Sequence, residues 1–151
     1  MSDYRLHREQ WVPHPLPATF DFFSKAENLE RLTPPFMGFH ILTPLPVEMK
    51  RGATIAYKLR VHGLPIRWLT EIEVWKPPYE FVDIQTKGPY KLWRHTHRFS
   101  EVDGGTLIAD TVEYALPFGP LGRLVHRLQV AHDLETIFEY RAHQVRTLFG
   151  K

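Results

Sequence analysis

Residues 88 to 99 read Gly88-Pro-Tyr-Lys-Leu-Trp-Arg-His-Thr-His-Arg-Phe99, and this stretch constrains the fold more than any other part of the chain. As a β-strand it places four side chains on one face: Trp93, His95, His97 and Phe99. The opposite face receives Arg94, Thr96 and Arg98 and is therefore the solvated one. A dry core strand would carry aliphatic side chains inward. Two imidazoles between two aromatic rings instead predict the wall of a pocket with a polar patch.

Alternating patterns on both sides of this stretch predict further strands. We expect them at 4–12, 39–45, 53–61, 66–74, 80–86 and 106–115, with the histidine strand at about 91–101. Asp103-Gly104-Gly105 is a strong hairpin turn, and the chain also turns at His62-Gly63. Strands joined by such tight turns pair antiparallel, so the sequence predicts an antiparallel sheet.

Helical patterns occur at two places. Two short helices, at 18–24 and 26–32, are expected between the first and second strands, and Thr33-Pro34-Pro35 ends the second one. After Pro120, apolar residues recur every three or four positions, which predicts one helix of about 28 residues. The sheet needs a cover on its buried face, and this helix is the only element long enough. The fold class is therefore α+β: a curved seven-stranded sheet around a long C-terminal helix, in one domain spanning 1–151.

Composition narrows the range of functions. The chain has 151 residues, a formal net charge of +2 and no Lys/Arg run, which argues against a nucleic-acid partner. Because Cys is absent, disulfides and thiolate chemistry are excluded. No apolar run approaches the roughly 20 residues of a membrane span, and the N-terminus lacks the apolar core of a signal peptide. We therefore expect a soluble cytoplasmic protein without integral membrane association.

The element order resembles the helix-grip proteins of the START/polyketide-cyclase (SRPBCC) superfamily, to which the birch-pollen-allergen fold also belongs. The residues that carry this resemblance are Phe20-Asp-Phe-Phe-Ser24, Ala26 to Pro35, Gly88-Pro-Tyr90, Trp93 to Phe99, and Tyr114 to Gly122; Leu134 to Arg141 looks like the bacterial branch. The resemblance covers essentially the whole chain. It implies a fold and a ligand-binding role, but it carries over no catalytic motif.

His95 and His97 are the first candidate site residues. We expect them to form hydrogen bonds inside a cavity, to a ligand or to ordered water. Two alternatives remain: both rings are satisfied by Asp or backbone partners, or the His-x-His pair holds a metal with Asp83 or Asp110 as third ligand. Neither Cys nor a helical His-Glu-x-x-His motif supports the metal, so we expect no metal and no cofactor.

Three further polar residues are candidates on the neighbouring strands. Asp83 and Gln85 enter the cavity if Phe81 also faces inward, although the opposite register fits the pattern nearly as well. Asp110 shares a face with Ile108, Val112 and Tyr114. A buried carboxylate must be paired, and an Asp-His pair would satisfy this need and could act as a general base.

Aromatic side chains are expected to supply the apolar walls: Tyr57, Trp68, Trp93, Phe99 and Tyr114. Plain core packing is an equally good interpretation for any single one of them. The arginines of the last helix, Arg123, Arg127, Arg141 and Arg146, are interpreted as a solvated face.

The sequence as a whole favours binding of a small hydrophobic or amphipathic ligand, such as a lipid, an isoprenoid or quinone, or an aromatic polyketide-like molecule. One alternative is a cyclase/aromatase-like or hydrolase-like enzyme that uses a cavity His-Asp pair. Another is a protein-interaction module of the quinone-chaperone type. A binding protein is favoured over an enzyme, and the pattern leaves catalytic residues, ligand identity and oligomeric state open.

Overall fold

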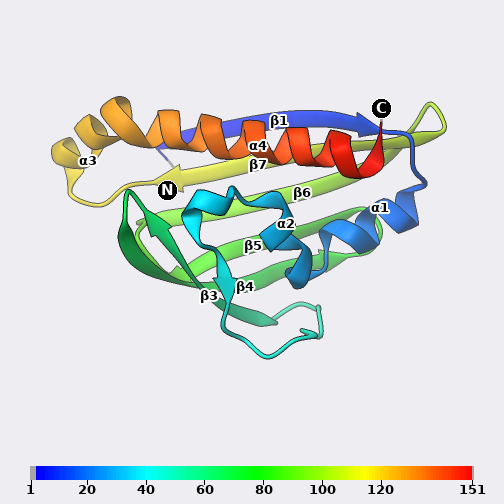
Figure 1. The fold of residues 1–151 in the computed structure, drawn as a ribbon, viewed down its shortest axis with the longest axis horizontal. Coiled ribbons are helices and arrows are strands. Elements are labelled where there is room, and N and C mark those ends of the chain that lie inside the picture. Colours follow the sequence, from blue (N-terminus) through cyan, green and yellow to red (C-terminus); the bar gives the residue numbers. More distant parts are fainter. Residues whose placement is uncertain (1–2, 151) are drawn as a thin grey trace.

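The computed structural model describes residues 3–150, and its main element is a seven-stranded antiparallel sheet (Figure 1). In chain order the strands are β1 (Tyr4–Val12), β2 (His40–Ile41), β3 (Thr54–Val61), β4 (Leu64–Lys76), β5 (Glu80–Lys87), β6 (Leu92–Val102) and β7 (Gly105–Ala115). Their spatial order is β1-β7-β6-β5-β4-β3-β2. Only the β1–β7 pair joins strands that are distant along the chain, and it brings the first strand beside the last.

Two tight turns set the register of the long strands. His62 and Gly63 between β3 and β4 have φ values of 51° and 82°, and Asp103 and Gly104 between β6 and β7 have φ values of 50° and 76°. Two successive residues with positive φ match the right-handed twist of the strands they join. The turn at Asp103 and Gly104 therefore fixes the pairing of the histidine strand β6 with β7, starting from the C-terminal end of β6.

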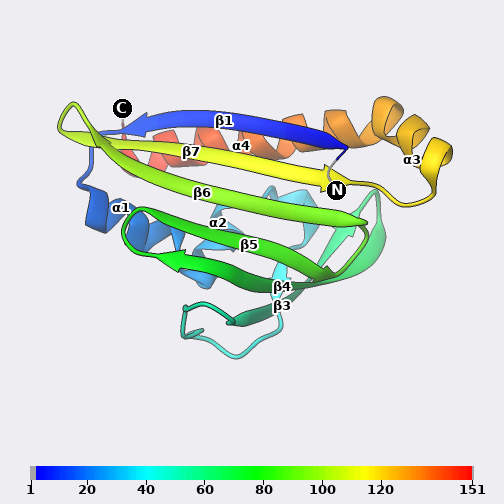
Figure 2. The same cartoon turned by 180° about the vertical axis from the view of Figure 1, so that it is seen from behind.

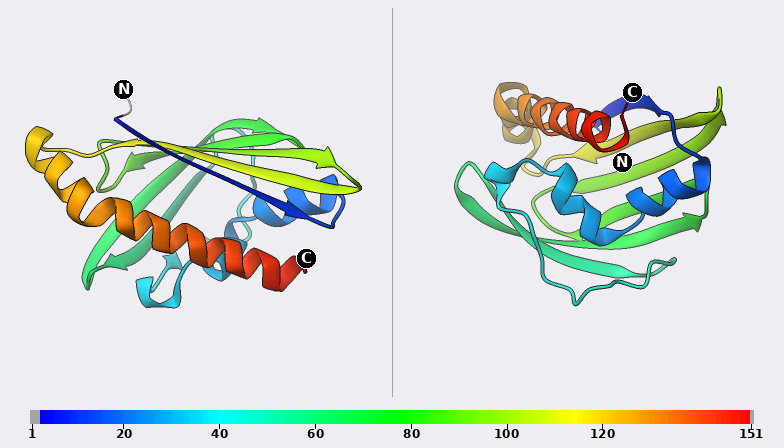
Figure 3. Two further views of the ribbon diagram at one scale, coloured as in Figure 1. Left: turned by 90° about the horizontal axis from the view of Figure 1, so that it is seen from above. Right: turned by 45° about the vertical axis from the view of Figure 1, so that its right-hand side comes forward.

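All helices lie on one face of the sheet, as the views from behind and from above show (Figures 2 and 3). Between β1 and β2 the chain forms α1 (Leu16–Phe23), the 3-10 turn η1 (Ala26–Asn28), α2 (Leu29–Leu32) and the 3-10 turn η2 (Pro35–Met37). After β7, a continuous helix consists of α3 (Gly119–Val125), the π-helical turn η3 (His126–Val130) and α4 (Ala131–Phe149). This helix runs along the β1–β7 side, while the short helices lie over the rest of the concave face.

The largest of the core clusters among residues 3–150 lies under α1. Phe20 contacts Phe81 and Phe99 of the sheet, with ring centroids 5.7 Å and 5.3 Å away. Val12 and Val145 complete the same cluster, so α1 joins the sheet to the C-terminal end of α4. Two members of this cluster, Phe23 and Phe81, also line the cavity described below, so the cluster forms one end of the cavity wall.

The predicted α+β architecture is confirmed, with three local differences. The strand expected at 39–45 is reduced to His40–Ile41, because Pro44 and Pro46 have no amide hydrogen to continue a ladder. The second short helix is split into a 3-10 turn and a single α-turn. The long helix contains a π-turn, which no apolar period in the sequence marks. No helix of residues 3–150 is long and apolar enough to span a membrane.

Candidate functional site

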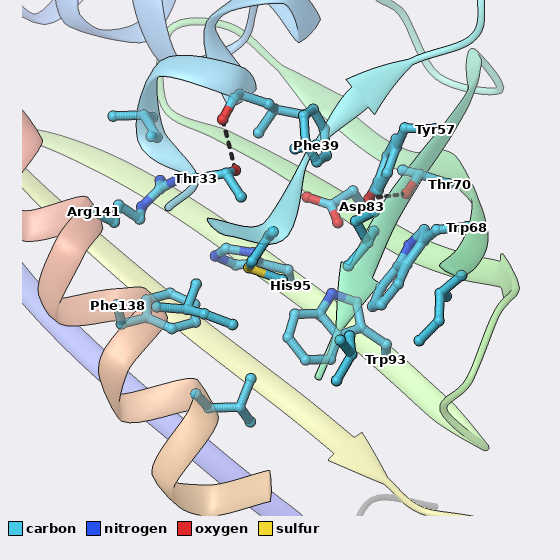
Figure 4. Close-up of a pocket in the computed structure, with 18 of the residues that line it drawn as sticks. Thr33, Phe39, Tyr57, Trp68, Thr70, Asp83, Trp93, His95, Phe138 and Arg141 are labelled. Carbon is cyan, nitrogen blue, oxygen red and sulfur yellow. Dashed lines mark hydrogen bonds between the residues drawn. The ribbon is translucent and has the colours of Figure 1, made fainter. Parts of the chain in front are cut away.

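A cavity of about 630 Å³ lies between the concave face of the sheet, the short helices and α4 (Figure 4). Most of its wall is apolar or aromatic and includes Leu32, Met37, Ile55, Leu59, Trp68, Trp93, Leu134 and Phe138. The volume falls within the roughly 300–1,000 Å³ of small-molecule pockets. At its rim, His62 of the β3–β4 turn lies 2.9 Å from a carboxylate oxygen of Asp133 in α4.

A cluster of buried charged groups closes one side of this cavity. The register pairs Asp83 with His95 and His97 with Asp110 across adjacent strands, so all four side chains point to the concave face. His97 Nε2 lies 2.6 Å from Asp83 Oδ2, and His95 Nε2 lies 2.9 Å from Asp110 Oδ1. The two imidazole rings stack with centroids 3.7 Å apart. The sheet therefore delivers two Asp-His pairs side by side.

Arg141 of α4 completes the cluster from the helix that covers the sheet (Figure 4). Its Nη2 lies 3.4 Å from Asp110 Oδ1, and its guanidinium lies over the ring of Phe23 at 5.3 Å. The sequence interpretation of Arg141 as part of a solvated face is wrong, because its side chain is 11% exposed and lines the cavity. Asp110 thus receives three partners: His95, His97 and Arg141.

Burial and charge together set the protonation states of this cluster. Burial tends to raise the pKa of Asp110, but Arg141 and His95 outweigh it and hold the pKa well below its usual value. Burial likewise opposes ionisation of Asp83, yet the hydrogen bond and charge of His97 lower its pKa. Both carboxyl groups are therefore ionised at neutral pH.

The pKa values of the two histidines shift in opposite directions. Burial lowers the pKa of His95, and the neighbouring charge of His97 lowers it further. Burial also disfavours the charged form of His97, but Asp110 and Asp83 outweigh it and raise the pKa of His97. With His95 neutral and His97 charged, the two cations and two carboxylates of the cluster balance. This balance is what makes four buried charges tolerable.

His95 keeps one ring nitrogen free for another molecule. Its Nε2 donates to Asp110, which leaves the lone pair of the neutral ring on Nδ1. None of the hydrogen bonds among residues 3–150 engages this nitrogen, and His95 lines the cavity. His95 therefore offers a hydrogen-bond acceptor to whatever occupies the cavity.

We expect the Asp83–His97 ion pair to stabilise the fold within a limited pH window. An Asp with a lowered pKa contributes stability above its unfolded value of 3.8, and this contribution is lost as the pH falls through the folded pKa. A His with a raised pKa contributes below its unfolded value of 6.5, and this contribution is lost as the pH rises through the folded pKa. Asp83→Asn should therefore cost about 1.5–3 kcal/mol near pH 5–6, and less below pH 4.

Urea unfolding of wild type and Asp83→Asn at pH 3, 5.5 and 8.5 measures this window. Asp133→Asn, which removes a carboxylate from an exposed ion pair at the rim, is the matched control and should cost about 1 kcal/mol or less. A penalty for Asp83→Asn that stays constant from pH 3 to pH 8.5 would contradict the ion pair.

Of the ten residues singled out in the sequence, six line the cavity: Tyr57, Trp68, Asp83, Trp93, His95 and His97. The other four lie outside its wall. Phe99 packs in the core under α1, and Asp110 lies behind the two histidines. Tyr114 donates to or accepts from His126 at 2.8 Å and packs among Tyr4, Tyr90 and Trp93.

Gln85 holds the loop that precedes β6. Its amide donates to the carbonyl of Tyr90 and accepts from the Tyr90 backbone N–H, at 2.7 Å and 3.0 Å. A side chain at Gly88 would collide with it, because a Cβ there would lie 2.4 Å from Gln85 Oε1. Gln85 therefore places the ring of Tyr90, a cavity residue that the sequence analysis did not single out, against the cavity wall.

A second polar spot lies away from the charged cluster. The hydroxyls of Tyr57 and Thr70 hydrogen-bond at 2.9 Å, and both residues line the cavity (Figure 4). The indole N–H of Trp68 is buried nearby without a hydrogen-bond partner among the described residues. Thr70 is not among the site residues predicted from the sequence. Its neighbours on the same face of β4 are apolar, so the alternating pattern gives no sign of a polar group there.

Among the described residues, one group of side chains has the spacing of a metal site: Asp83, His95 and His97. One ligand atom from each lies within 4.8 Å of the others. Hydrogen bonds to carboxylates already occupy Nε2 of both histidines. The guanidinium of Arg141 adds a positive charge beside Asp110, and this charge also helps to lower the pKa of Asp83. The donor set therefore fits a self-neutralised cluster better than a cation site.

No family model and no curated protein sequence matches this chain. Solved structures do match it. The protein TTHA0849 from Thermus thermophilus is 18% identical with a TM-score of 0.67, and the match covers 96% of this chain and 99% of that one. Ara h 8.0201 is 17% identical with a TM-score of 0.63, and the match covers 95% and 98% of the two chains.

The nucleoside-diphosphate sugar epimerase from Corynebacterium glutamicum is 27% identical with a TM-score of 0.66. That match covers 93% of this chain but 28% of the epimerase, so it is confined to one part of a longer protein. The chain has the helix-grip fold. The resemblance to the birch-pollen-allergen-like superfamily is confirmed at the level of fold, with the seven-stranded sheet and the long C-terminal helix in the expected places.

Proposed function

We propose that this chain binds a small amphipathic molecule in its internal cavity. The observation that carries the proposal is an apolar cavity of about 630 Å³ that ends on a buried, charge-balanced cluster. The free acceptor of His95 and the guanidinium of Arg141 lie in its wall. Lipids, isoprenoids or quinones, and aromatic polyketide-like molecules share the required chemistry, an apolar body with one polar end.

Two kinds of contact would hold such a ligand. Its apolar body gains about 25 cal/mol for each Å² removed from water against the aromatic and aliphatic walls. Its polar end meets a hydrogen-bond acceptor on His95 and unused N–H donors on Arg141, which makes one contact to Asp110. A ligand with a hydroxyl next to a carbonyl would donate a hydrogen bond to His95 and accept one from Arg141. A purely apolar molecule would leave His95 and Arg141 without partners.

Filling the cavity should abolish binding without unfolding the protein. Ile66 of β4 lines the cavity, so Ile66→Trp places an indole in the empty space. We expect the affinity for the fluorescent probe anilinonaphthalene sulfonate to fall at least tenfold, as measured by titration. Native mass spectrometry of freshly purified protein should show a retained small molecule in wild type and not in the variant.

Ile84→Trp is the matched control, because Ile84 alternates with Asp83 on β5 and faces the other side of the sheet. This control should bind the probe like wild type. Equal loss in both tryptophan variants, or probe binding that survives Ile66→Trp, would argue against an internal binding site.

A second candidate function is catalysis with His95 as general base. It is favoured by one observation: the lowered pKa of His95 keeps the ring neutral, with Nε2 oriented by Asp110 and Nδ1 open to the cavity. A positioned base of this kind accelerates proton abstraction about 10²- to 10⁴-fold, as a cyclase/aromatase-like or hydrolase-like reaction requires. Turnover of a polyketide-like or ester substrate that disappears in His95→Phe would support it.

A further inference from the structure

The strongest feature outside the cavity is an exposed apolar stripe on the first turns of the C-terminal helix. The stripe consists of Leu121, Leu124, Val125 and Leu128, which recur at helical spacing. Their exposed fractions are 60%, 42%, 44% and 69%, in that order. Phe118, just before the helix, is 78% exposed. None of these five residues belongs to a core cluster of the described structure. This end of the helix projects beyond the sheet (Figures 1 and 3).

Two segments around this stripe are basic. Residues 58–67, which include the β3–β4 turn, and residues 117–132 together contain five Lys or Arg and no Asp or Glu. The whole chain has a formal net charge of +2, so the remaining residues carry −3. The first acidic residue after the stripe, Asp133, is paired with His62. The apolar stripe therefore lies on the positively charged end of a molecule that is acidic elsewhere.

The same end carries the rim of the cavity. Gln129 and Val130 follow Leu128 directly and line the cavity, as do His62 and Gly63 of the β3–β4 turn. Phe36 also lines the cavity and is 73% exposed, and Leu64 beside the turn is 68% exposed. Exposed apolar side chains thus occur on the helix, the β3–β4 hairpin and η2, in or next to segments that line the cavity.

We infer that this end of the protein, comprising the stripe 118–128 and the β3–β4 turn, docks on an anionic lipid bilayer. A helix with an exposed apolar stripe and Arg on its polar side lies in the interface of such a membrane, with its apolar face in the acyl boundary. Each Lys or Arg close to an anionic surface strengthens binding about fivefold. Docking in this orientation turns the cavity rim toward the source of an amphipathic ligand. The inference extends the proposed function but is tested without a cavity ligand.

Co-sedimentation with vesicles of phosphatidylglycerol and phosphatidylcholine, compared with phosphatidylcholine alone, tests the inference. Wild type should bind the anionic vesicles, more weakly as salt is raised, because ionic screening weakens the charge term. Leu121→Ser/Leu128→Ser should lower the partition coefficient at least tenfold, and Arg123→Gln/Arg127→Gln about 10- to 25-fold. Tyr79→Ser is the control, since Tyr79 is 60% exposed in the β4–β5 turn at the opposite end of the sheet.

Three results would overturn the inference: no preference for anionic vesicles, equal loss in Tyr79→Ser, or a wild-type dimer that Leu121→Ser/Leu128→Ser dissociates. The last result would assign the stripe to a second copy of the chain. Ile66→Trp should sediment with vesicles like wild type, and Leu121→Ser/Leu128→Ser should keep its affinity for anilinonaphthalene sulfonate. Failure of the cavity proposal and failure of membrane docking therefore give different patterns.

Discussion

Replacement of Asp110 by Asn is expected to lower the free energy of unfolding by about 3–5 kcal/mol at pH 7. Asp110 contacts His95, His97 and Arg141 together. Its loss leaves the buried guanidinium of Arg141 and the imidazolium of His97 without this charged partner, because the Asn Oδ1 still accepts hydrogen bonds but carries no charge. Removing one member of a buried ion pair costs more than removing the pair, because the remaining charge stays desolvated.

Urea denaturation at pH 7 measures this loss. Asp21→Asn is the control, since Asp21 forms an exposed ion pair with Lys25 and should cost about 1 kcal/mol or less. Asp110→Asn/Arg141→Met should be more stable than Asp110→Asn alone, because the uncompensated charge is gone. A penalty for Asp110→Asn no larger than that for Asp21→Asn would contradict the cluster, and so would a double variant less stable than the single one.

Local patterns in the sequence predict the sheet and the identity of its inward face. Alternation along 91–101 places His95 and His97 on one side, and the structure confirms it because side-chain direction in a strand depends only on parity. The tight turns at His62-Gly63 and Asp103-Gly104 similarly fix antiparallel pairing from a few residues. These features are decided by interactions within about ten residues.

The chemistry of the site depends on contacts that no local pattern contains. Whether Phe81 and Asp83 or Val82 and Ile84 face inward is set by the register of β5 against β6, which pairs Asp83 with His95. Strand alternation allowed both registers, because both faces of β5 carry apolar residues. The cluster therefore follows from pairing across the sheet, and the sequence left it as one of two alternatives.

The position of Arg141 was missed for a different reason. The apolar residues after Pro120 recur every three or four positions and predict one regular helix. The π-turn at 126–130 inserts an extra residue and shifts the helical phase, so Leu134, Phe138 and Val145 face inward while the earlier leucines are exposed. Arg141 lies three residues after Phe138 on that inward side, a position that follows from the spacing within α4 alone. The sequence interpretation is wrong because it assigns the charged Arg141 to solvent, whereas Asp110 pairs with it in the interior.

His95→Phe is expected to weaken binding of a hydroxylated aromatic ligand up to about 100-fold, while a ligand of the same shape without the hydroxyl is unaffected. The physical reason is that Nδ1 of His95 is the free acceptor in the wall, and a buried hydroxyl that loses its acceptor costs about 1–3 kcal/mol. Calorimetric titration of 2-naphthol and 2-methylnaphthalene into wild type and variant measures the difference. Phe retains a ring of similar size, and Asp110 keeps His97 and Arg141 as partners.

The pH dependence of the same titration separates hydrogen bonding from ring packing. Because the pKa of His95 is lowered, Nδ1 is unprotonated at pH 7 and becomes protonated as the pH falls below the ordinary value of 6.5 toward the folded pKa. Protonation removes the acceptor, so 2-naphthol should bind wild type more weakly at low pH, while His95→Phe shows no corresponding change. Equal weakening of 2-naphthol and 2-methylnaphthalene by His95→Phe would mean that the imidazole contributes surface alone. The polar end of the ligand would then have to be recognised by Arg141 or by the Tyr57–Thr70 pair.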